Sequence, residues 1–407
     1  MPQLHYFNPG HETAIWQGVK NYTPPANVGR MTRELAFLPV WYADANDFVF
    51  VEEETDSAFF TSDPIKKLRP FAAILTCQAL KQRALPECAL EAAPWGLSPH
   101  SIHLFEKLRD DFSLTLSIPC WKEAYKQLTS RQTACNCLQA LKEKLPHVLL
   151  PSTPCFCHDI AAVERFMDAH PAPFVVKTPF SSSGRGLLWL QGKLTDKEKE
   201  WIKGALKKQG AVSIEPALDK RLDFAMEFHS DGKGEVTYEG LSIFQAEKRG
   251  AYSGNLLGVV DQWETYLQRL FGNTYRQIKD TLRETLSQLY GHDYAGYLGV
   301  DMLLYFQDSQ LHIHPCVEIN MRYTMGIVAL HLSRNYVSPG SHGAMYITFD
   351  ARPGEAYRQH LQMQAAYPLV IEGHRAKKGY LSLCPVTADT KYRAYLLLDD
   401  NPYQIDH

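Results

Sequence analysis

Two apolar runs joined by a short polar segment constrain the fold of this chain more than any other feature. The first run covers residues 298–305, the second ends at residue 319, and residues 307–310 lie between them. This pattern predicts two antiparallel strands connected by a hairpin turn. Side chains two residues apart in a strand point to the same face, so Glu318 and Asn320 should direct their oxygen atoms to one place.

Asp301, in the first run, is the third polar side chain that this hairpin could bring to that place. A loop of two or four residues would pair Asp301 with Cys316 and put it diagonal to Glu318, with roughly 7–8 Å between the backbones. A three-residue loop would turn Asp301 to the other face. We expect Asp301, Glu318 and Asn320 to hold one or two hard divalent cations, which prefer oxygen ligands. An ordinary surface hairpin is the alternative interpretation of this pattern alone.

A second motif consists of two short strands and the loop between them. The run at residues 174–178 is followed by serines and glycines at 181–186 and by a second apolar run at 187–190. Backbone N–H groups of such a loop can converge on an anion, and Lys177 and Arg185 add positive charge. The motif is not a P-loop, because its lysine precedes the glycines. Alone it fits an ordinary hairpin turn; together with the acidic hairpin it fits a nucleoside triphosphate bound with magnesium.

The order of these motifs resembles the ATP-grasp superfamily over about half of the chain, residues 125–335. In this family two α+β subdomains hold ATP between them. The resemblance places an adenine-binding hinge at residues 212–218, a ribose-binding acid at Asp223, and Arg131 where the family usually has lysine, a change that keeps a phosphate-binding charge. It implies that the following residues bind the nucleotide: Arg131, Lys177, Ser182, Ser183, Gly184, Gly186, Glu215 and Asp223.

The resemblance also implies a reaction. In the family, magnesium, with manganese as an alternative, accompanies ATP, and a substrate carboxylate attacks the γ-phosphate to give an acyl phosphate and ADP. An amine, or sometimes a thiol, then displaces phosphate. Arg322 would lie near the reacting phosphoryl group, and Lys248, in a loop at 246–250, would touch the phosphates. The resemblance thus predicts an ADP-forming carboxylate–amine ligase. A small-molecule kinase on the same fold and a nucleotide-binding protein without turnover are the alternatives.

The expected fold is of the α/β class with α+β subdomains: an ATP-grasp fold with an N-terminal Rossmann-like pre-ATP-grasp domain. We expect this domain at residues 1–125, a small subdomain with the phosphate loop and adenine hinge at 126–230, and a large subdomain with the metal hairpin at 231–407. Within the large subdomain, apolar residues spaced by three and four predict one long helix at 263–290. The last 70 residues read as closing strands.

The N-terminal domain is expected to open with a strand at residues 4–7, which leads into a turn. Ligands of open α/β sheets bind beyond the carboxyl ends of the strands. Asn8, His11 and Glu12 are therefore candidate substrate contacts. A capped turn before a helix that starts at His11 explains the same residues equally well.

Length and charge restrict the class of protein. A chain of 407 residues exceeds the usual size of one core, so several subdomains are expected. A net charge of −3 gives no general attraction to nucleic acid or membranes. The sequence predicts neither a signal peptide nor a membrane span. We therefore expect a cytoplasmic protein that acts on small molecules, a carboxylate and an amine, and homo-oligomerisation stays open.

The cysteines and histidines give no further evidence for a metal or catalytic site. The nine cysteines are expected to be reduced thiols, because a cytosolic chain rarely keeps disulfides. Cys155, Cys157 and His158 lack the spacing of a structural zinc site. His312 and His314 flank the acidic hairpin, where they are expected to be polar groups on the strand surface rather than the border of the site.

Overall fold

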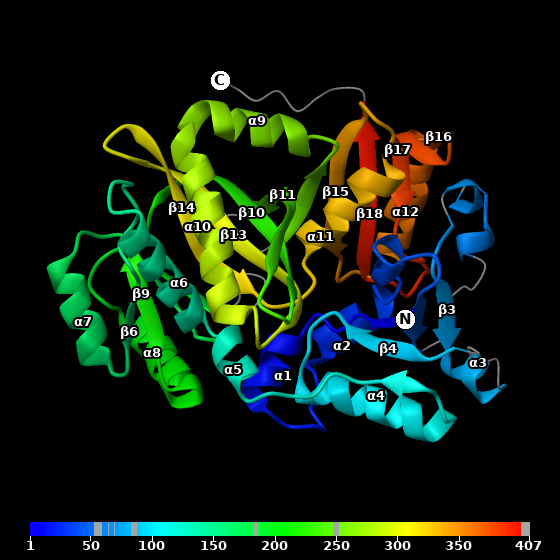
Figure 1. Cartoon of the computed structure of the whole chain (residues 1–407), viewed down its shortest axis with the longest axis horizontal. Helices are drawn as coiled ribbons and strands as arrows, with labels where there is room; N and C mark the ends of the chain where they lie inside the picture. Colours follow the sequence, from blue (N-terminus) through cyan, green and yellow to red (C-terminus); the bar gives the residue numbers. More distant parts are fainter. Residues whose placement is uncertain are drawn as a thin grey trace.

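A computed structural model shows an α/β protein built around sheets, with helices on their faces (Figure 1). The structure describes residues 1–52, 59–63, 65–68, 70–82, 88–181, 186–246 and 252–399. Within these ranges the strands form a five-stranded, a four-stranded and a nine-stranded sheet. This architecture confirms the predicted fold class.

The N-terminal sheet is parallel and has the strand order β3-β2-β1-β4-β5. Its order reverses between β1 and β4, which is where open α/β sheets bind ligands. Helix α4 begins at a capping box formed by Ser98 and Ser101, with Pro99 in the first turn. The strands are β1 Gln3–Tyr6, β2 Phe48–Val51, β3 Ala73–Thr76, β4 Leu90–Pro94 and β5 Leu116–Ser117. The helices are α1 His11–Gln17, α2 Ala26–Glu34, α3 Cys77–Lys81 and α4 Pro99–Phe112, with 3-10 turns at Leu38–Trp41, Phe59–Thr61 and Ile65–Lys67.

The small sheet has the order β6-β9-β7-β8, and its neighbouring strands are antiparallel. Two helices cover it, and Val163 and Ile202 of these helices pack on Val176 and Ile214 of the sheet. Helix α8 starts at a capping box of Thr195 and Glu198. The strands are β6 Cys155–Cys157, β7 Phe174–Lys177, β8 Leu187–Leu190 and β9 Val212–Pro216, and the helices are α7 Ile160–Ala169 and α8 Asp196–Gln209.

The large sheet has the order β14-β13-β10-β11-β12-β15-β18-β17-β16. The C-terminal strands thus extend the sheet that contains the acidic hairpin, as the centre and right of Figure 1 show. The strands are β10 Asp219–Asp231, β11 Val236–Ala246, β12 Tyr252–Leu257, β13 Ala295–Gln307, β14 Gln310–Asn320, β15 His342–Phe349, β16 Val370–Glu372, β17 Arg375–Ser382 and β18 Tyr392–Asp399.

Helices cover this sheet, and one prediction about them is wrong. The expected single helix at 263–290 is two helices, α9 and α10, because Gly272 lies between them with a φ of 55°, a conformation that glycine adopts easily. The last residues also contain a helix, α12, besides the expected strands. The helices are α5 Ala124–Thr129, α6 Arg131–Lys144, α9 Val260–Phe271, α10 Asn273–Tyr290, α11 Met325–His331 and α12 Glu355–Ala366, with a π-helical turn at Leu332–Tyr336.

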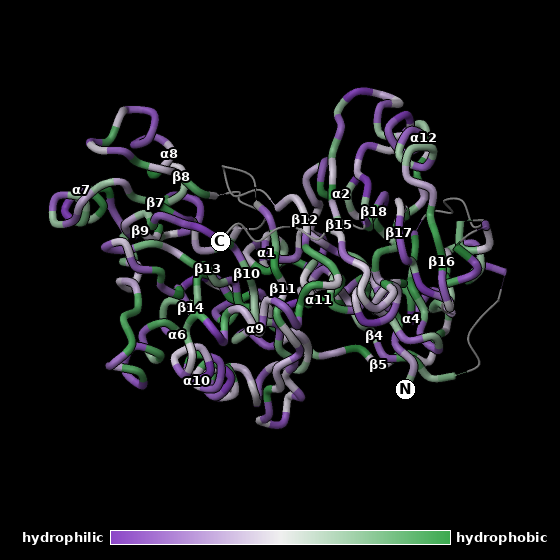
Figure 2. Tube along the Cα trace, turned by 90° about the horizontal axis from the view of Figure 1, so that it is seen from above, coloured by the Kyte–Doolittle hydropathy of each residue, from purple (hydrophilic) through white to green (hydrophobic). Residues whose placement is uncertain are grey.

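The core joins α6 and α10 to the large sheet. Cys137 and Leu138 of α6 lie in one cluster with Phe224 of β10 and Leu282 of α10. Figure 2 shows hydrophobic stretches mainly in the interior and hydrophilic ones along the peripheral helices and loops. This packing fixes the start of α6 beside β14, at the edge of the large sheet.

The acidic hairpin has the predicted face but a different pairing. Its turn is a two-residue loop, because Gln307 pairs with Gln310, and the strands stay in this register as far as His314. The register then shifts, so Asp301 lies opposite Glu318 and not opposite Cys316. The shift occurs next to Pro315, which cannot donate a ladder hydrogen bond and is tolerated at bulges of edge strands. Because the shift is by two residues, the side chains keep their face.

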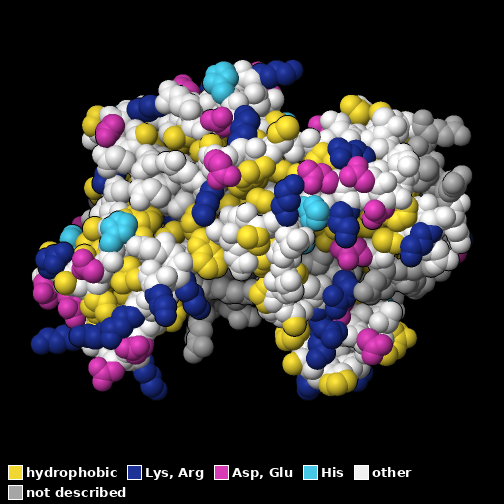
Figure 3. All heavy atoms as spheres, turned by 90° about the horizontal axis from the view of Figure 1, so that it is seen from below, with side chains coloured by type: hydrophobic (Ala, Val, Ile, Leu, Met, Phe, Trp, Pro, Cys, Tyr) yellow, Lys and Arg dark blue, Asp and Glu magenta, His cyan; other side chains and the backbone are white. Residues whose placement is uncertain are grey.

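All nine cysteines lie in described parts of the chain and are free. Among the described residues, no group of three or more histidine, cysteine, aspartate or glutamate side chains is arranged to hold a metal ion. In the same residues, no helix is both long and apolar enough to cross a bilayer. Basic and acidic side chains are interspersed over the face shown in Figure 3.

Candidate active site

A cavity of about 1030 Å³ brings together residues of the N-terminal domain, the small sheet and the large sheet. The N-terminal domain contributes Pro9, Gly10, Trp95 and residues of α2, and most of the other lining residues lie on the small and large sheets. Eight residues that the sequence singled out line it: Arg131, Lys177, Glu215, Asp223, Asp301, Glu318, Asn320 and Arg322.

Other predicted residues are not part of the described lining. Ser182, Ser183, Gly184 and Lys248 lie outside the described residues. Gly186 closes the β7–β8 hairpin: its carbonyl accepts a hydrogen bond from the Thr178 amide at 3.0 Å, and its φ is 72°. A Cβ atom at Gly186 would overlap the Thr178 hydroxyl, so glycine is required by the turn itself.

Asp301 and Glu318 face each other on adjacent strands, and Asn320 completes the set of oxygen donors. The Asn320 amide donates a hydrogen bond of 3.1 Å to Asp301 Oδ1. Desolvation, followed by the charges of Glu318 and Glu227, raises the pKa of Asp301 to about 8. Two carboxylates and an amide oxygen are hard donors that suit Mg²⁺, and a cation between the carboxylates would remove their repulsion. The donor set therefore fits the predicted metal.

Arg131, the first residue of α6, connects three elements. Its Nη1 lies 3.0 Å from Glu318 Oε2, its Nε donates to the Thr178 carbonyl at 3.1 Å, and its Nη2 donates to Ser181 Oγ at 3.1 Å. The guanidinium is buried and is held between the acidic hairpin and the loop after β7. Arg131 thus lies at the junction between the small and large sheets.

A second ion pair joins Lys177 of β7 to Glu215 of β9, and both side chains are nearly buried. Burial opposes ionisation of Glu215, but Lys177 and His314 outweigh it and hold the pKa of this carboxyl below its usual value. Burial, partly offset by Glu215, lowers the pKa of His314 to about 4. The prediction that His314 is a strand-surface group is wrong, because it is 3 % exposed and lines the cavity.

Asp223, expected near a ribose, points into the same cavity from β10. Its carboxylate pairs with Lys220, three residues earlier on the same strand. Because β10 follows β9 directly, Asp223 lies close in the chain to the predicted hinge at 212–218.

Arg322 follows the acidic hairpin and is held by several groups. Its Nε donates to Glu12 Oε1 at 2.7 Å, its Nη2 to Asn320 Oδ1 at 2.8 Å and its Nη1 to the Tyr323 carbonyl at 3.1 Å. Glu12 belongs to α1, so this contact joins the N-terminal domain to the hairpin. Glu12 and His11 are buried beside one another, with His11 Nδ1 3.2 Å from Glu12 Oε2.

Asn8 has a different role from the one expected. Its side chain donates to the Gly96 carbonyl at 2.7 Å and accepts from the Gly96 amide at 3.1 Å. These bonds tie the end of β1 to the segment after β4. Asn8 is not part of the described lining of the cavity, whereas its neighbours Pro9 and Gly10 are.

The sequence reasoning missed three residues of this site: Glu227, Ser242 and Thr324. The Glu227 carboxylate accepts hydrogen bonds from Ser242 Oγ at 3.1 Å and from Thr324 Oγ1 at 2.9 Å. Glu227 lies four residues after Asp223 on the same strand, with Ala225 between them. Side chains alternate between the two faces of a strand, so the position of Asp223 could have indicated that Glu227 faces the same cavity. The partners come from other elements and had no such indication.

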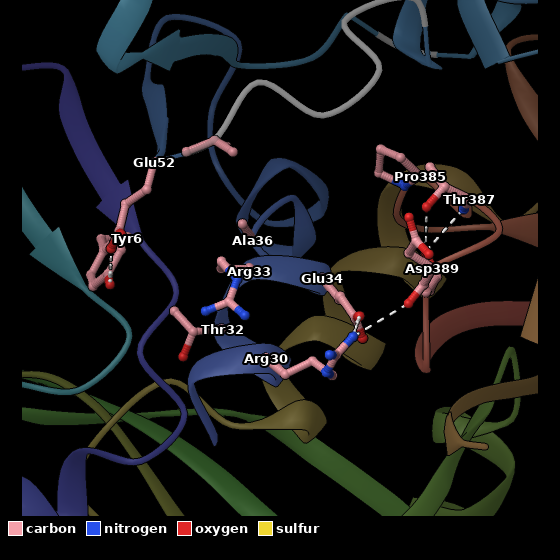
Figure 4. A pocket seen from close by; sticks show the side chains of 12 residues that line it. Tyr6, Arg30, Thr32, Arg33, Glu34, Ala36, Glu52, Pro385, Thr387 and Asp389 are labelled. Atoms are coloured by element: carbon pink, nitrogen blue, oxygen red, sulfur yellow. Dashed lines mark hydrogen bonds and ion pairs between the residues drawn. The ribbon is translucent and has the colours of Figure 1, made fainter. Parts of the chain in front are cut away.

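A smaller cavity, of about 330 Å³, lies between α2 and the segment before β18 (Figure 4). Arg30 is 3.0 Å from Glu34, and Glu34 accepts hydrogen bonds from the backbone amides of Lys391 and Tyr392. These contacts attach α2 to the C-terminal strands. None of the residues predicted from the sequence as site residues lines this cavity.

Comparison with known proteins supports the fold assignment. No protein-family model and no curated protein sequence matches the chain. Among solved structures, the biotin carboxylase–β-γ-ATP complex from Campylobacter jejuni is similar, with a TM-score of 0.54, 11% identity, and coverage of 98% of this chain and 88% of that one. N5-carboxyaminoimidazole synthetase from Staphylococcus aureus has a TM-score of 0.49 with 12% identity, covering 98% of this chain and 94% of that one. L-amino acid ligase from Bacillus licheniformis has 0.48 with 14% identity, covering 99% and 94%.

The likeness to the biotin carboxylase structure extends over nearly the whole chain and over all three sheets. The protein therefore has the ATP-grasp fold, preceded by a Rossmann-like N-terminal domain. This confirms the fold that the order of the motifs predicted.

Proposed function

We propose that this protein is an ATP- and magnesium-dependent ligase that activates a substrate carboxylate as an acyl phosphate and joins it to an amine, with release of ADP. One observation carries the proposal. A single cavity is lined by the opposed carboxylates Asp301 and Glu318 and by the basic residues Arg131, Lys177 and Arg322. Acidic metal ligands next to fixed positive charges are what a nucleoside triphosphate requires.

The nucleotide would occupy the part of the cavity between the small and large sheets. Lys177 and Arg131 would contact its phosphates, and the end of β9 with Glu215 would meet the adenine. Asp223, on the next strand in the chain, β10, would bind the ribose. Both basic residues are paired with carboxylates, so ATP phosphates would compete with Glu215 and Glu318 for them.

Asp301, Glu318 and Asn320 would hold Mg²⁺, which when bound neutralises charge on the terminal phosphates. Arg322 would stabilise the negative charge that develops on the transferred phosphoryl group, since its guanidinium is directed by Glu12 and Asn320 toward this end of the hairpin. Lys248, Ser182, Ser183 and Gly184 are proposed to complete the phosphate contacts. The acid substrate would approach from the side of the N-terminal domain.

The proposal is tested by incubating the protein with Mg-ATP, hydroxylamine and a panel of carboxylic acids. An acyl phosphate intermediate gives a hydroxamate together with equal amounts of ADP and phosphate. Glu318→Gln should abolish all three products. Glu235→Gln, which changes an exposed carboxylate on the β10–β11 hairpin, should abolish none of them. AMP and pyrophosphate would contradict the proposal. A stable phosphorylated product without free phosphate would show a kinase on this fold.

A further inference from the structure

Glu227 is a buried carboxylate in the wall of the active-site cavity, and the nucleotide and metal roles described above do not use it. It lies on β10 and is 1 % exposed. It lines the same cavity as the acidic hairpin. A carboxylate in such a place is costly unless a proton, a cation or several hydrogen bonds stabilise it.

The surroundings of Glu227 are built to accommodate a carboxylate. Ser242 and Thr324 each donate one hydroxyl hydrogen bond to it. Two glycines leave room for its oxygens: a Cβ at Gly299 would lie 2.8 Å from Glu227 Oε2, and a Cβ at Gly326 would overlap Oε1. Hydroxyl groups stabilise a carboxylate by hydrogen bonding but supply no positive charge, so these contacts give Glu227 no charge partner.

The basic residues of the site are already paired with other carboxylates. Arg131 pairs with Glu318 and Lys177 with Glu215. Arg322 pairs with Glu12 in the same way. Within the described part of the chain, this leaves Asp301 and Glu227 as cavity carboxylates without a basic residue in ion-pair contact. Asp301 belongs to the proposed magnesium site. Glu227 is therefore the carboxylate that a second cation would neutralise.

The strand register gives Glu227 a definite distance from the metal ligands. Glu227 lies opposite Gly299, which lies opposite Asn320. In the neighbouring row of the same face, Asp301 lies opposite Glu318. The two rows are two residues apart along the strands, roughly 7 Å. Gly299 has no side chain, and the space above it is taken by the Thr324 methyl group and the Glu227 carboxylate, so no side chain of β13 lies between Glu227 and Asn320 in this row.

The electrostatics favour a cation at this place. Burial, opposed by the hydrogen bonds from Thr324 and Ser242 and by the charge of Arg322, raises the pKa of Glu227 to about 7. The charged and titratable groups that face it are Asp301 on β13, Arg322 after β14 and Tyr252 on β12. A cation at this place would relieve the repulsion between Glu227 and Asp301.

The remaining lining of the cavity indicates what the cation carries. Met325 precedes Gly326 in the chain, and aromatic and aliphatic side chains of α2, β12, β15 and β18 continue the wall. These apolar lining residues are Val28, Met31, Tyr252, Met325, Tyr346 and Tyr392. A metal ion would not need such a wall, whereas an organic ammonium ion with an apolar substituent would bury it there.

We propose that Glu227, supported by Ser242 and Thr324, binds the ammonium group of the amine substrate, and that the apolar wall receives the substituent of that amine. This inference rests on the proposed ligase function and names its nucleophile as a primary amine with an apolar group. Binding at Glu227 holds the nitrogen two residues along the strands from the row of Asp301 and Glu318. This is beside the place where the acyl phosphate would form. An ammonium ion is not a nucleophile, so the bound group first transfers one proton to the Glu227 carboxylate. The free amine then attacks the acyl carbon, and inorganic phosphate leaves with the second proton of the amine. The energetic advantage is positional, because the amine is held next to its target.

A binding experiment tests this assignment without turnover. The full-length protein, loaded with Mg-ADP, is titrated with n-butylamine and 2-phenylethylamine and, as a neutral analogue of equal size, with 2-phenylethanol. A hydrogen bond between charged groups predicts that an amine binds at least about tenfold more tightly than the alcohol. Glu227→Gln should remove this preference, while Mg-ADP affinity stays within about threefold. Glu235→Gln, the matched carboxylate-to-amide change outside the cavity, should leave the preference intact.

The possible results separate the two proposals. Failure of both amines to bind the wild type, or an unchanged preference in Glu227→Gln, overturns the ammonium site. If Glu227→Gln does not fold, Ser242→Ala is used, which should weaken amine binding several-fold and leave alcohol binding unchanged; equal loss for both ligands overturns the assignment. A preserved ammonium preference with no hydroxamate from any acid contradicts the ligase and not the site. Hydroxamate formation without an ammonium preference contradicts the site and not the ligase.

Discussion

The guanidinium of Arg322 and the carboxylate of Glu12 form an ion pair with an Nε–Oε1 distance of 2.7 Å across 310 residues of sequence. Burial raises and His11 and Arg322 lower the pKa of Glu12, with the net result well below its usual value. The two charges therefore stabilise one another in the interior. Because Glu12 lies on α1 and Arg322 follows β14, the pair couples the N-terminal domain to the acidic hairpin.

Arg322→Ala should reduce turnover far more than ATP affinity, because the proposed role of Arg322 is at the phosphoryl group that is transferred. Loss of one preorganised donor predicts a fall in kcat of about 100- to 1000-fold. The variant should also unfold at a lower temperature, since Glu12 remains as an unpaired buried charge. Steady-state kinetics, ATP titration and thermal unfolding measure these effects.

The double variant Arg322→Ala/Glu12→Gln separates the two consequences. It should regain part of the lost melting temperature, because the buried negative charge is gone, but none of the turnover. Recovery of turnover would show that Arg322 acts only by neutralising Glu12. Arg322→Lys keeps the positive charge but lacks the planar array of donors. Its turnover should lie between that of the wild type and that of Arg322→Ala.

The acidic hairpin shows how far sequence patterns reach. Period-two alternation gave the shared face of Asp301, Glu318 and Asn320. The two-residue turn is formed by Asp308 and Ser309, both with positive φ, as a type I′ hairpin turn requires. The pairing of Asp301 was wrong because a bulge near Pro315 shifts the register, and the effect of a bulge on register is not encoded in alternation. The face survived only because the shift is even.

Contacts between distant segments could not be predicted in the same way. Glu12 was recognised as a polar residue after the first strand, but its partner Arg322 is defined by how two domains pack. The same holds for Glu227, whose hydroxyl partners come from β11 and the segment before α11. Gly272 was overlooked as the break in the helical pattern, although a glycine in a helix interior is unfavourable by about 1 kcal/mol relative to alanine.

Lys177→Ala should weaken ATP binding and also lower the stability of the unliganded protein. From the sequence alone a nearly unchanged melting temperature is expected, but Lys177 pairs with the buried Glu215. Removing one partner of a buried pair costs about 3–5 kcal/mol. Lys177→Met/Glu215→Gln should restore most of the melting temperature without restoring ATP affinity. ATP affinity equal to wild type in Lys177→Ala would contradict the phosphate role.

The stability of the metal-free protein should fall as pH rises, partly because of Asp301. The pKa of Asp301 is raised from 3.8 to about 8, so the folded chain keeps a proton that the unfolded chain has released. The stabilisation from this proton is present below about pH 4 and is lost as pH rises to about 8. In chelator-treated samples, Asp301→Asn should therefore gain melting temperature over wild type toward pH 8, by at least about 2 °C.

Magnesium provides the control for this prediction. Adding Mg²⁺ with ADP should stabilise the wild type at high pH and should not stabilise Asp301→Asn to the same extent. The measurement is thermal unfolding from about pH 5 to about pH 8 with and without the ion. Parallel pH curves for the two proteins would show that Asp301 ionises without cost in the folded state.

Gly326→Ala should disturb the cavity, whereas Gly204→Ala should not. A Cβ at Gly326 would overlap Glu227 Oε1 and lie 2.5 Å from Ser242 Oγ, so the Glu227 carboxylate or α11 must shift. Overpacking of this kind costs about 1–3 kcal/mol. Gly204 lies inside α8 with nothing within 4 Å of an added Cβ, so alanine should stabilise the helix by about 0.5–1 kcal/mol. Chemical denaturation measures the free energy of unfolding of the two variants, which should change in opposite directions. If Gly326→Ala is as stable as the wild type or more stable, the Glu227 carboxylate has room to move. In that case Gly326→Ala should still reduce binding of 2-phenylethylamine, because a displaced Glu227 no longer faces the apolar wall.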